Sequence, residues 1–237
     1  SIKSQLSSVP ACQRAVKKAV VERLMSAHGV SELPETGATY GIEISLLDNV
    51  ATLTIDTTGP ALHKRGYRTL SGKAPIKETL AAAMAMLSFW EPGRPLVDPF
   101  CGTGTIPIEA ALIGRNIAPG INRNFTAETW PQLPTPMWRE ARNEAMGAIG
   151  PPLDERIIGY DVDEEALSMA RHHAEEAGVD EDVHFQRQPF RELTSKRRHG
   201  VLIANPPYGM RVSDREAVEA LYREMPEVFR RLETWSI

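Results

Sequence analysis

A rigid polar turn late in the sequence, Asn205-Pro206-Pro207-Tyr208, has the residue types that could hold the amino group of a nucleobase. It follows the apolar run 201–204, which predicts a buried strand. The two prolines fix φ and lack N–H groups, so the turn is stiff and its carbonyls stay free to accept hydrogen bonds. The Asn205 side chain and a neighbouring carbonyl could accept from one NH2 group, while the Tyr208 ring stacks on a flat base. A strand-end turn without a ligand is the alternative interpretation.

A glycine-rich turn, Asp98-Pro99-Phe100-Cys101-Gly102-Thr103-Gly104, lies between a short apolar strand and a predicted helix. Glycines allow the backbone to approach a ligand closely, and a helix N-terminus offers free N–H groups to a carboxylate. A dinucleotide site would have a third glycine where this sequence has Pro107, and an acidic residue about 20 positions further on. Asp98 suits an ammonium or sulfonium group better than a pyrophosphate. The turn therefore predicts a site for S-adenosylmethionine (SAM).

An acidic residue at the end of the next strand, Asp161, could accept hydrogen bonds from both hydroxyls of a ribose. Asp163 is the predicted N-cap of a helix over 164–177, which Gly178 ends. A plain loop acid is the other interpretation of Asp161. Its place beside the glycine-rich turn favours the ribose contact.

Apolar runs that alternate with helical patterns predict a doubly wound α/β fold for residues 76–237. The expected strands are 95–98, 156–161, 182–187 and 200–204, and a further helix covers 214–232. Residues 235–237 read as the opening of a fifth strand, and a complete sheet of this kind needs about three more. We therefore expect the sequence to be a fragment, with the sheet incomplete at the C-terminus.

The N-terminal residues predict a smaller α+β unit. A helical face between Ser8 and Gly29 is followed by the alternating apolar residues 42–46. Asp48-Asn49 then separates them from a second apolar stretch over 50–55, which predicts a β-hairpin.

Composition limits the class of protein. The net charge of −4 argues against nucleic-acid binding by the whole surface. Cys12 and Cys101 form neither a disulfide framework nor a metal-binding set, which predicts a reducing compartment and no metal. Without a run of about 20 apolar residues or a signal peptide, we expect a cytoplasmic protein without a membrane partner. The oligomeric state is not predicted.

A basic stretch between residues 61 and 77 contains no acidic residue and predicts contact with phosphate. Its expected RNA-binding residues are Lys64, Arg65, Arg68 and Lys73. RNA is favoured over duplex DNA because single-stranded loops present unstacked bases. A long loop over 115–136 carries Phe125 and Trp130, which could cap the target base or anchor the loop on the core.

The combined motifs closely resemble those of THUMP-domain class I SAM-dependent RNA methyltransferases, and in particular the bacterial guanine-N2 methyltransferases of large-subunit ribosomal RNA. The resemblance covers about residues 9–230. It rests on the turns at 98–105 and 205–208, on Asp161, and on the flanking segments 62–68, 74–82, 108–111 and 116–120.

The resemblance implies a role for each site residue. Asp98, Cys101, Gly102 and Gly104 line the methionine end of SAM, and Asp161 its ribose. Ala74 and Pro75 close over the cofactor, which Asn205 also contacts. Asn205, Pro206 and Tyr208 hold the target base as the catalytic residues. Where the family has an aspartate for the adenine amine this sequence has Pro189, so either the Gln188 carbonyl or the backbone holds adenine.

The implied domains are the back part of a THUMP domain (1–59), a linker (60–75) and a Rossmann-like methyltransferase domain (76–237). The implied activity is methyl transfer to an exocyclic base amine, and the favoured target is guanine N2 of ribosomal RNA. Transfer-RNA guanine N2, DNA adenine N6 and a non-catalytic RNA-binding role are the alternatives.

Overall fold

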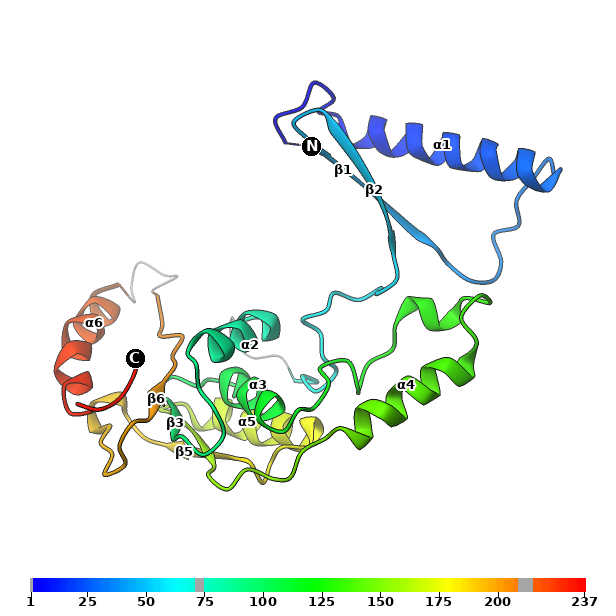
Figure 1. The fold of residues 1–237 in the computed structure, drawn as a ribbon. Coiled ribbons are helices and arrows are strands. Elements are labelled where there is room, and N and C mark those ends of the chain that lie inside the picture. Colours follow the sequence, from blue (N-terminus) through cyan, green and yellow to red (C-terminus); the bar gives the residue numbers. More distant parts are fainter. Residues whose placement is uncertain (1, 71–74, 209–214) are drawn as a thin grey trace. The chain divides into compact units, whose positions relative to one another are not determined.

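The computed structural model describes residues 2–70, 75–208 and 215–237 (Figure 1). The chain divides into two compact units, one formed by residues 1–61 and 124–139, the other by residues 62–123 and 140–237. Residues of the predicted linker from 62 onward therefore belong to the second unit. We describe each unit by itself.

The first unit has a long helix and a β-hairpin. Helix α1 (Val9–His28) begins with a proline in its first turn and ends at Gly29, whose φ of 64° gives the left-handed cap expected of a glycine. Strands β1 (Gly41–Leu47) and β2 (Val50–Asp56) pair antiparallel, with Leu47 opposite Val50. Positive φ angles at Asp48 and Asn49 are those of a type I′ turn, whose backbone twist matches that of the two strands. The predicted helix and hairpin are confirmed.

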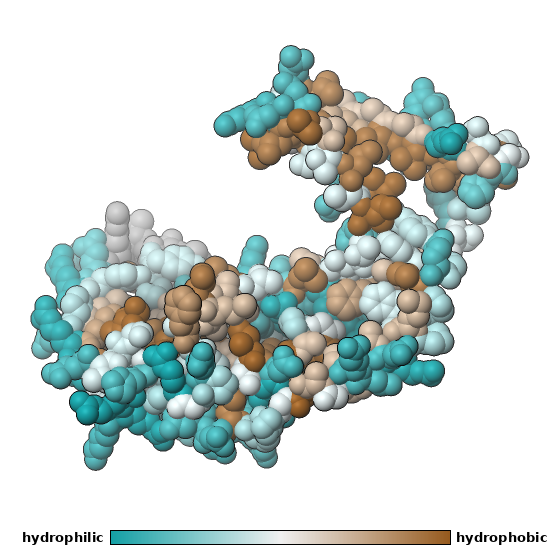
Figure 2. Space-filling model, viewed as in Figure 1, coloured by the Kyte–Doolittle hydropathy of each residue, from teal (hydrophilic) through white to brown (hydrophobic). Residues whose placement is uncertain are grey.

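The hairpin leaves apolar side chains uncovered. Ile42 faces Ile55 across the ladder and Ile44 faces Leu53, so the four side chains share one face. Leu53 and Ile55 are more than half exposed. Figure 2 shows hydrophobic (brown) surface on the part of the molecule that carries the hairpin. The short 3-10 helix η1 (Thr126–Thr129) hydrogen-bonds to the chain just after β2, through Thr126 to Thr58 and Ala127 to Thr57.

The second unit contains a four-stranded parallel sheet. In chain order its strands are β3 (Leu96–Asp98), β4 (Ile157–Asp161), β5 (Val183–Arg187) and β6 (Val201–Leu202). Their order in space is β5-β4-β3-β6, which makes β3 the strand at which the chain changes direction across the sheet. Ser236 adds a parallel bridge to Val201, so the predicted fifth strand does begin beside β6.

Helices cover both faces of this sheet, and alternate residues of each strand point to opposite faces. Leu96 and Val201 pack with α2 (Glu78–Leu87), α3 (Thr105–Gly114) and α5 (Glu164–Ala177) in one core. Val97 and Leu202 pack on the other face with α6 (Arg215–Phe229) and η2 (Phe190–Glu192). Helix α4 (Thr135–Gly147) precedes β4. The two-sided burial explains why β3 and β6 lie in continuous apolar runs, whereas β5, at the end of the described sheet, alternates buried and exposed residues.

The doubly wound α/β class and its four strands are therefore confirmed, with strand ends that differ by one or two residues. Within the ranges 2–70, 75–208 and 215–237, none of the helices is both long and apolar enough to cross a membrane. The same ranges contain no cluster of three or more His, Cys, Asp or Glu side chains that could hold a metal ion.

Candidate active site

The sheet topology brings the three sequence motifs to one edge. The chain reverses across the sheet at β3, and ligands of doubly wound folds bind at the carboxyl ends of the strands at such a point. Asp98 ends β3 and Asp161 ends β4. On the other side, the Ile203 N–H donates to the Val97 carbonyl at 3.0 Å and carries the ladder toward Asn205. The glycine-rich turn therefore lies between Asp161 and Asn205.

The two glycines of this turn differ in what surrounds them. Gly104 has a φ of 82°, and a Cβ atom there would lie 2.7 Å from the Phe185 ring and 2.9 Å from the Ala170 side chain. Gly104 thus allows the close packing of α3 against β5 and α5. Gly102 has a φ of 52°, and a Cβ atom would meet nothing within 4 Å. The space beside Gly102 is open to a ligand.

Hydrogen bonds join the turn to the neighbouring strand. The Cys101 N–H donates to the Tyr160 carbonyl at 2.9 Å, and the Gly102 N–H donates to Asp161 Oδ2 at 2.8 Å. The other oxygen of Asp161 accepts from the Asp163 N–H at 3.0 Å. A carboxylate has about four acceptor positions, so Asp161 retains capacity for two hydroxyl donors.

Asp98 is almost completely buried, with 1% of its surface exposed. Burial raises its pKa to about 8; the nearby Asp161 adds to this rise, whereas the hydrogen bond from the Phe100 N–H opposes it. A carboxyl group in such surroundings favours a cationic partner, which would restore its ionised form. Cys101 is also buried, and burial followed by the charge of Asp98 raises the pKa of its thiol.

These features fit the polar groups of SAM. Gly102 leaves open space, Asp98 suits an ammonium group, and Asp161 has acceptor capacity for ribose hydroxyls. The N-cap of α3, Gly104, makes no side-chain cap, which leaves the first N–H groups of the helix for a carboxylate.

The segment after β5 has Pro189 where the resembled family has an aspartate that binds the adenine amine. Pro189 is the N-cap of η2, and the buried Phe190 stacks on Phe100 with ring centroids 5.0 Å apart. The Gln188 side-chain NH2 donates to the Glu192 carbonyl at 3.3 Å. This contact leaves the Gln188 side-chain oxygen as an acceptor for an adenine amine.

The turn over 205–208 extends from β6 into a half-exposed position. Asn205 and Pro206 are half-buried, and Tyr208 has 61% of its surface exposed. In the part of the chain that the structure describes, the Asn205 side chain makes no hydrogen bond. A half-buried amide without an internal partner and an exposed aromatic ring are suited to hold a base.

Two arginines of the basic segment are more buried than the sequence indicated, and both are paired with carboxylates. The side chain of Arg65 is only 12% exposed and pairs with Glu109, and that of Arg68 is 17% exposed and pairs with Glu78. Their surroundings therefore do not favour the predicted contact with RNA phosphates, because both charges already have carboxylate partners. Lys64 is exposed. Lys73 and Ala74 lie outside the described residues, whereas Pro75 is described and exposed, three residues before α2 begins.

Sequence reasoning did not identify Glu78, Glu109 and His173, which are buried polar residues beside the glycine-rich turn or on the helices around it. Glu109 gave one signal, because it stands within the apolar run 106–112 of a helix. His173 carries no sequence signal that separates it from the other histidines, yet its side chain is fully buried.

The aromatic residues of the long loop anchor it. Trp130 stacks on Tyr40 with centroids 4.7 Å apart and donates its indole N–H to the Thr39 carbonyl at 3.0 Å. Phe125 stacks on Trp138. Of the two interpretations, these contacts support anchoring within the first unit.

Comparison with known proteins gives the family. The family model described as RMKL-like, methyltransferase domain, matches residues 65–237. The Bacillus subtilis protein named "Putative RNA methyltransferase YpsC" is 48% identical over 239 residues, which are 100% of this chain and 62% of that protein. This chain thus spans about three fifths of that relative.

Two crystal structures share both fold and sequence. The "predicted N6-adenine-specific DNA methylase" from Listeria monocytogenes is 50% identical with a TM-score of 0.91, over 98% of this chain and 62% of that one. SMU.472, "a putative methyltransferase complexed with SAH", is 46% identical with a TM-score of 0.90 over the same shares. SAH is what SAM becomes after it gives up its methyl group. Since the family model matches well over half of the sequence, the chain belongs to the RMKL-like methyltransferase-domain family, which is SAM-dependent.

Proposed function

We propose that this protein is a SAM-dependent RNA methyltransferase whose target is an exocyclic base amine, with guanine N2 of ribosomal RNA favoured by the motif resemblance. The observation that carries the proposal is the position of Asn205. Its side chain follows β6, next to the glycine-rich turn at the carboxyl end of β3, and has no hydrogen-bond partner among the described residues.

The chemistry requires a positioned amine rather than a strong base. Bound SAM supplies an electrophilic methyl group on a sulfonium centre. The guanine N2 lone pair is conjugated with the ring and therefore barely nucleophilic. In our proposal the Asn205 side-chain oxygen and the Pro206 carbonyl accept the two N–H groups, which directs the nitrogen lone pair toward the methyl group. The proton leaves the methylated nitrogen for water after transfer.

The same two acceptors, the Asn205 side-chain oxygen and the Pro206 carbonyl, can also bind the N6 amine of adenine in DNA. That is the specificity in the name of the Listeria protein. We favour RNA for two reasons. The relative from Bacillus subtilis is named for RNA, and the exposed Lys64 belongs to a basic segment at the start of the second unit. Residues 1–59 are proposed to be part of a THUMP RNA-binding domain, with residues 60–75 as the linker to the methyltransferase domain over 76–237. Cytoplasmic location is part of the same proposal.

The test uses the full-length protein, labelled SAM and three acceptors: total ribosomal RNA, total transfer RNA and DNA. We expect transfer to ribosomal RNA and recovery of N2-methylguanosine after digestion. Transfer to DNA alone would overturn the RNA proposal. It would still be consistent with Asn205 and Pro206 binding the target amine.

Two variants test the residues. Asn205→Ala should lower single-turnover transfer by on the order of 10²–10³ because it removes one acceptor positioned for the transition state. Tyr208→Ala should lose about 1–3 kcal/mol of stacking per base and so raise the Michaelis constant for RNA. Both should bind SAM with nearly unchanged affinity. Rapid transfer by Asn205→Ala would mean that this turn has only a structural role.

A further inference from the structure

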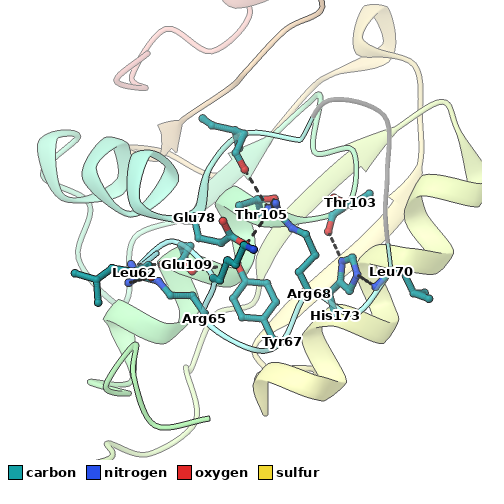
Figure 3. A network of polar contacts seen from close by, with 12 residues as sticks. Leu62, Arg65, Tyr67, Arg68, Leu70, Glu78, Thr103, Thr105, Glu109 and His173 are labelled. Atoms are coloured by element: carbon teal, nitrogen blue, oxygen red, sulfur yellow. Dashed lines mark hydrogen bonds and ion pairs between the residues drawn. The ribbon is translucent and has the colours of Figure 1, made fainter. Parts of the chain in front are cut away.

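Residues 65–70 of the second unit form a network of buried polar contacts with the helices around the glycine-rich turn (Figure 3). Arg68 is the centre of this network. Its guanidinium donates to the Thr105 hydroxyl at 2.7 Å and to the Ile76 carbonyl at 3.0 Å, and it pairs with Glu78 at 3.4 Å. Thr105 is the first residue of α3 and Glu78 the first of α2, so one side chain joins the starts of both helices.

A second contact reaches the turn itself. His173, on α5, is fully buried between Thr103 of the glycine-rich turn and Leu70. Its Nδ1 lies 3.2 Å from the Thr103 carbonyl, and the Leu70 N–H points to Nε2 at 3.4 Å. Since a carbonyl can only accept and an N–H can only donate, the ring is the neutral form with its proton on Nδ1. Burial lowers the pKa of His173, which keeps this form in place.

A third set of contacts in the network, made by Arg65 and Tyr67, does not involve the glycine-rich turn. Arg65 pairs with Glu109 at 3.3 Å, and the buried Tyr67 hydroxyl donates to the same carboxylate at 3.0 Å. Glu109 lies in the second turn of α3, away from its N-terminal end. Arg65 and Arg68 thus form two similar ion pairs from one segment, and only Arg68 of the two contacts Thr105, the residue that directly follows the glycine-rich turn.

We propose that Arg68 and His173 are positioning residues of the SAM site: they hold Thr103 and Thr105 so that the Gly102 backbone and the first N–H groups of α3 stand in the geometry that SAM requires. Neither residue needs to touch the cofactor. The network acts on the two ends of the segment 103–105, which contains Gly104 at a φ of 82° and makes no side-chain cap of its own.

The composition of the network supports positioning over simple stabilisation. In the described part of the chain, Arg68 Nε, Glu78 Oε2 and the Thr103 hydroxyl are buried without a hydrogen-bond partner. The Nε of Arg65 in the neighbouring pair shares this feature, so what distinguishes Arg68 is its contact with Thr105. Buried ion pairs with unsatisfied atoms add little to stability compared with apolar packing, although they fix geometry well.

The test compares two variants of the full-length protein, Arg68→Met and Arg65→Met. Each removes one buried arginine–glutamate pair of the same segment. We measure SAM affinity by calorimetry, the melting temperature, and hydrogen exchange of residues 101–106 without SAM. Arg68→Met should weaken SAM binding about tenfold, because the charge-assisted hydrogen bond that holds Thr105 is lost, and speed exchange in the turn. Arg65→Met should lower the melting temperature and leave SAM affinity within about twofold.

Four further variants keep the test valid if Arg68→Met does not fold. Thr105→Val removes the acceptor of Arg68 and keeps its pair with Glu78, whereas Thr105→Ser keeps the acceptor. Only Thr105→Val should weaken SAM binding. His173→Asn can still donate to Thr103 and should bind SAM better than His173→Leu.

The inference rests on the placement of SAM at this turn. If Gly102→Ala leaves SAM affinity unchanged, that placement is wrong. If Gly102→Ala weakens binding and Arg68→Met and Thr105→Val do not, the positioning role alone is wrong. Equal losses of SAM affinity in Arg65→Met and Arg68→Met would also overturn it, because general destabilisation would then explain both.

Discussion

The Gly102 N–H donates to Asp161 Oδ2 at 2.8 Å, which joins the glycine-rich turn after β3 to the carboxyl end of β4. One acidic side chain therefore both orders the turn and stands at the proposed ribose position. Asp161 lies 59 residues further along the chain than Gly102. The adjacent, parallel pairing of β3 and β4 is what brings them together.

Asp161→Ala should weaken SAM binding by roughly 1.5–3 kcal/mol, because hydrogen bonds from ribose hydroxyls to a charged acceptor are lost. Calorimetry measures the affinity. Asp163→Ala is the control two residues away: it removes the N-cap that accepts from Glu165 and Ala166. This control should lower stability by about 0.5–2 kcal/mol and leave SAM affinity unchanged. Unchanged affinity in a folded Asp161→Ala protein would exclude Asp161 from the site.

Alanine at the two glycines of the turn should have opposite dominant effects. Gly104→Ala places a methyl group 2.7 Å from Phe185, so the protein should lose about 1–3 kcal/mol of stability from overpacking, in addition to backbone strain. Gly102→Ala meets no neighbour and should cost only about 1–2 kcal/mol for the left-handed φ, but its methyl group fills the space proposed for SAM. Thermal melts and SAM titrations of both variants separate the effects. A Gly102→Ala protein with normal SAM affinity would contradict the proposed binding position.

The pKa of Asp98, about 8, predicts that SAM binding releases a proton near pH 7. The free protein holds Asp98 mostly protonated at that pH, and a cationic ammonium group beside it favours the carboxylate. SAM affinity should therefore rise with pH up to about 8, at most tenfold per pH unit. Calorimetry in two buffers of different ionisation enthalpy counts the protons released. The Asp98→Asn variant should release none from this site, and equal heats in both buffers for the unaltered protein would contradict the prediction.

The same raised pKa has a consequence for folding. The folded protein keeps the Asp98 proton that the unfolded chain loses at the usual pKa of an aspartate, near 4. The contribution of Asp98 to stability is thus fully present below that value and is lost as the pH rises through about 8. Denaturant unfolding across this range should show a smaller dependence on pH in Asp98→Asn than in the unaltered protein.

Lys64→Ala should lower RNA affinity and reduce the slope of log affinity against log salt by about 0.7 for one lost phosphate contact to single-stranded RNA. Lys64 is exposed, whereas the guanidinium groups of its neighbours Arg65 and Arg68 are paired with carboxylates. Arg223→Ala, on α6, removes one charge from a side chain that is 80% exposed and is the matched control. An identical salt slope for Lys64→Ala and the unaltered protein would mean that Lys64 is ordinary solvated surface.

Local sequence determined the elements and their ends. The turn at Asp48-Asn49, the N-cap Asp163 and the caps Gly29 and Gly178 all stand where short-range pattern placed them. These features depend on backbone φ and on hydrogen bonds between residues at most a few positions apart. The same holds for the alternation of buried strands and helices, which gave the doubly wound class.

Tertiary structure decided which charges are free. Lys64, Arg65 and Arg68 read alike in the sequence, and only the positions of Glu109 and Glu78 distinguish them. These carboxylates lie 44 and 10 residues away along the chain, on helices whose packing brings them to the linker residues. The burial of His173 has the same cause, since its partners Thr103 and Leu70 are 70 and 103 residues distant. An ion pair or a buried imidazole depends on the distance between side chains in space, and sequence spacing fixes that distance only within a helix, a strand or a turn.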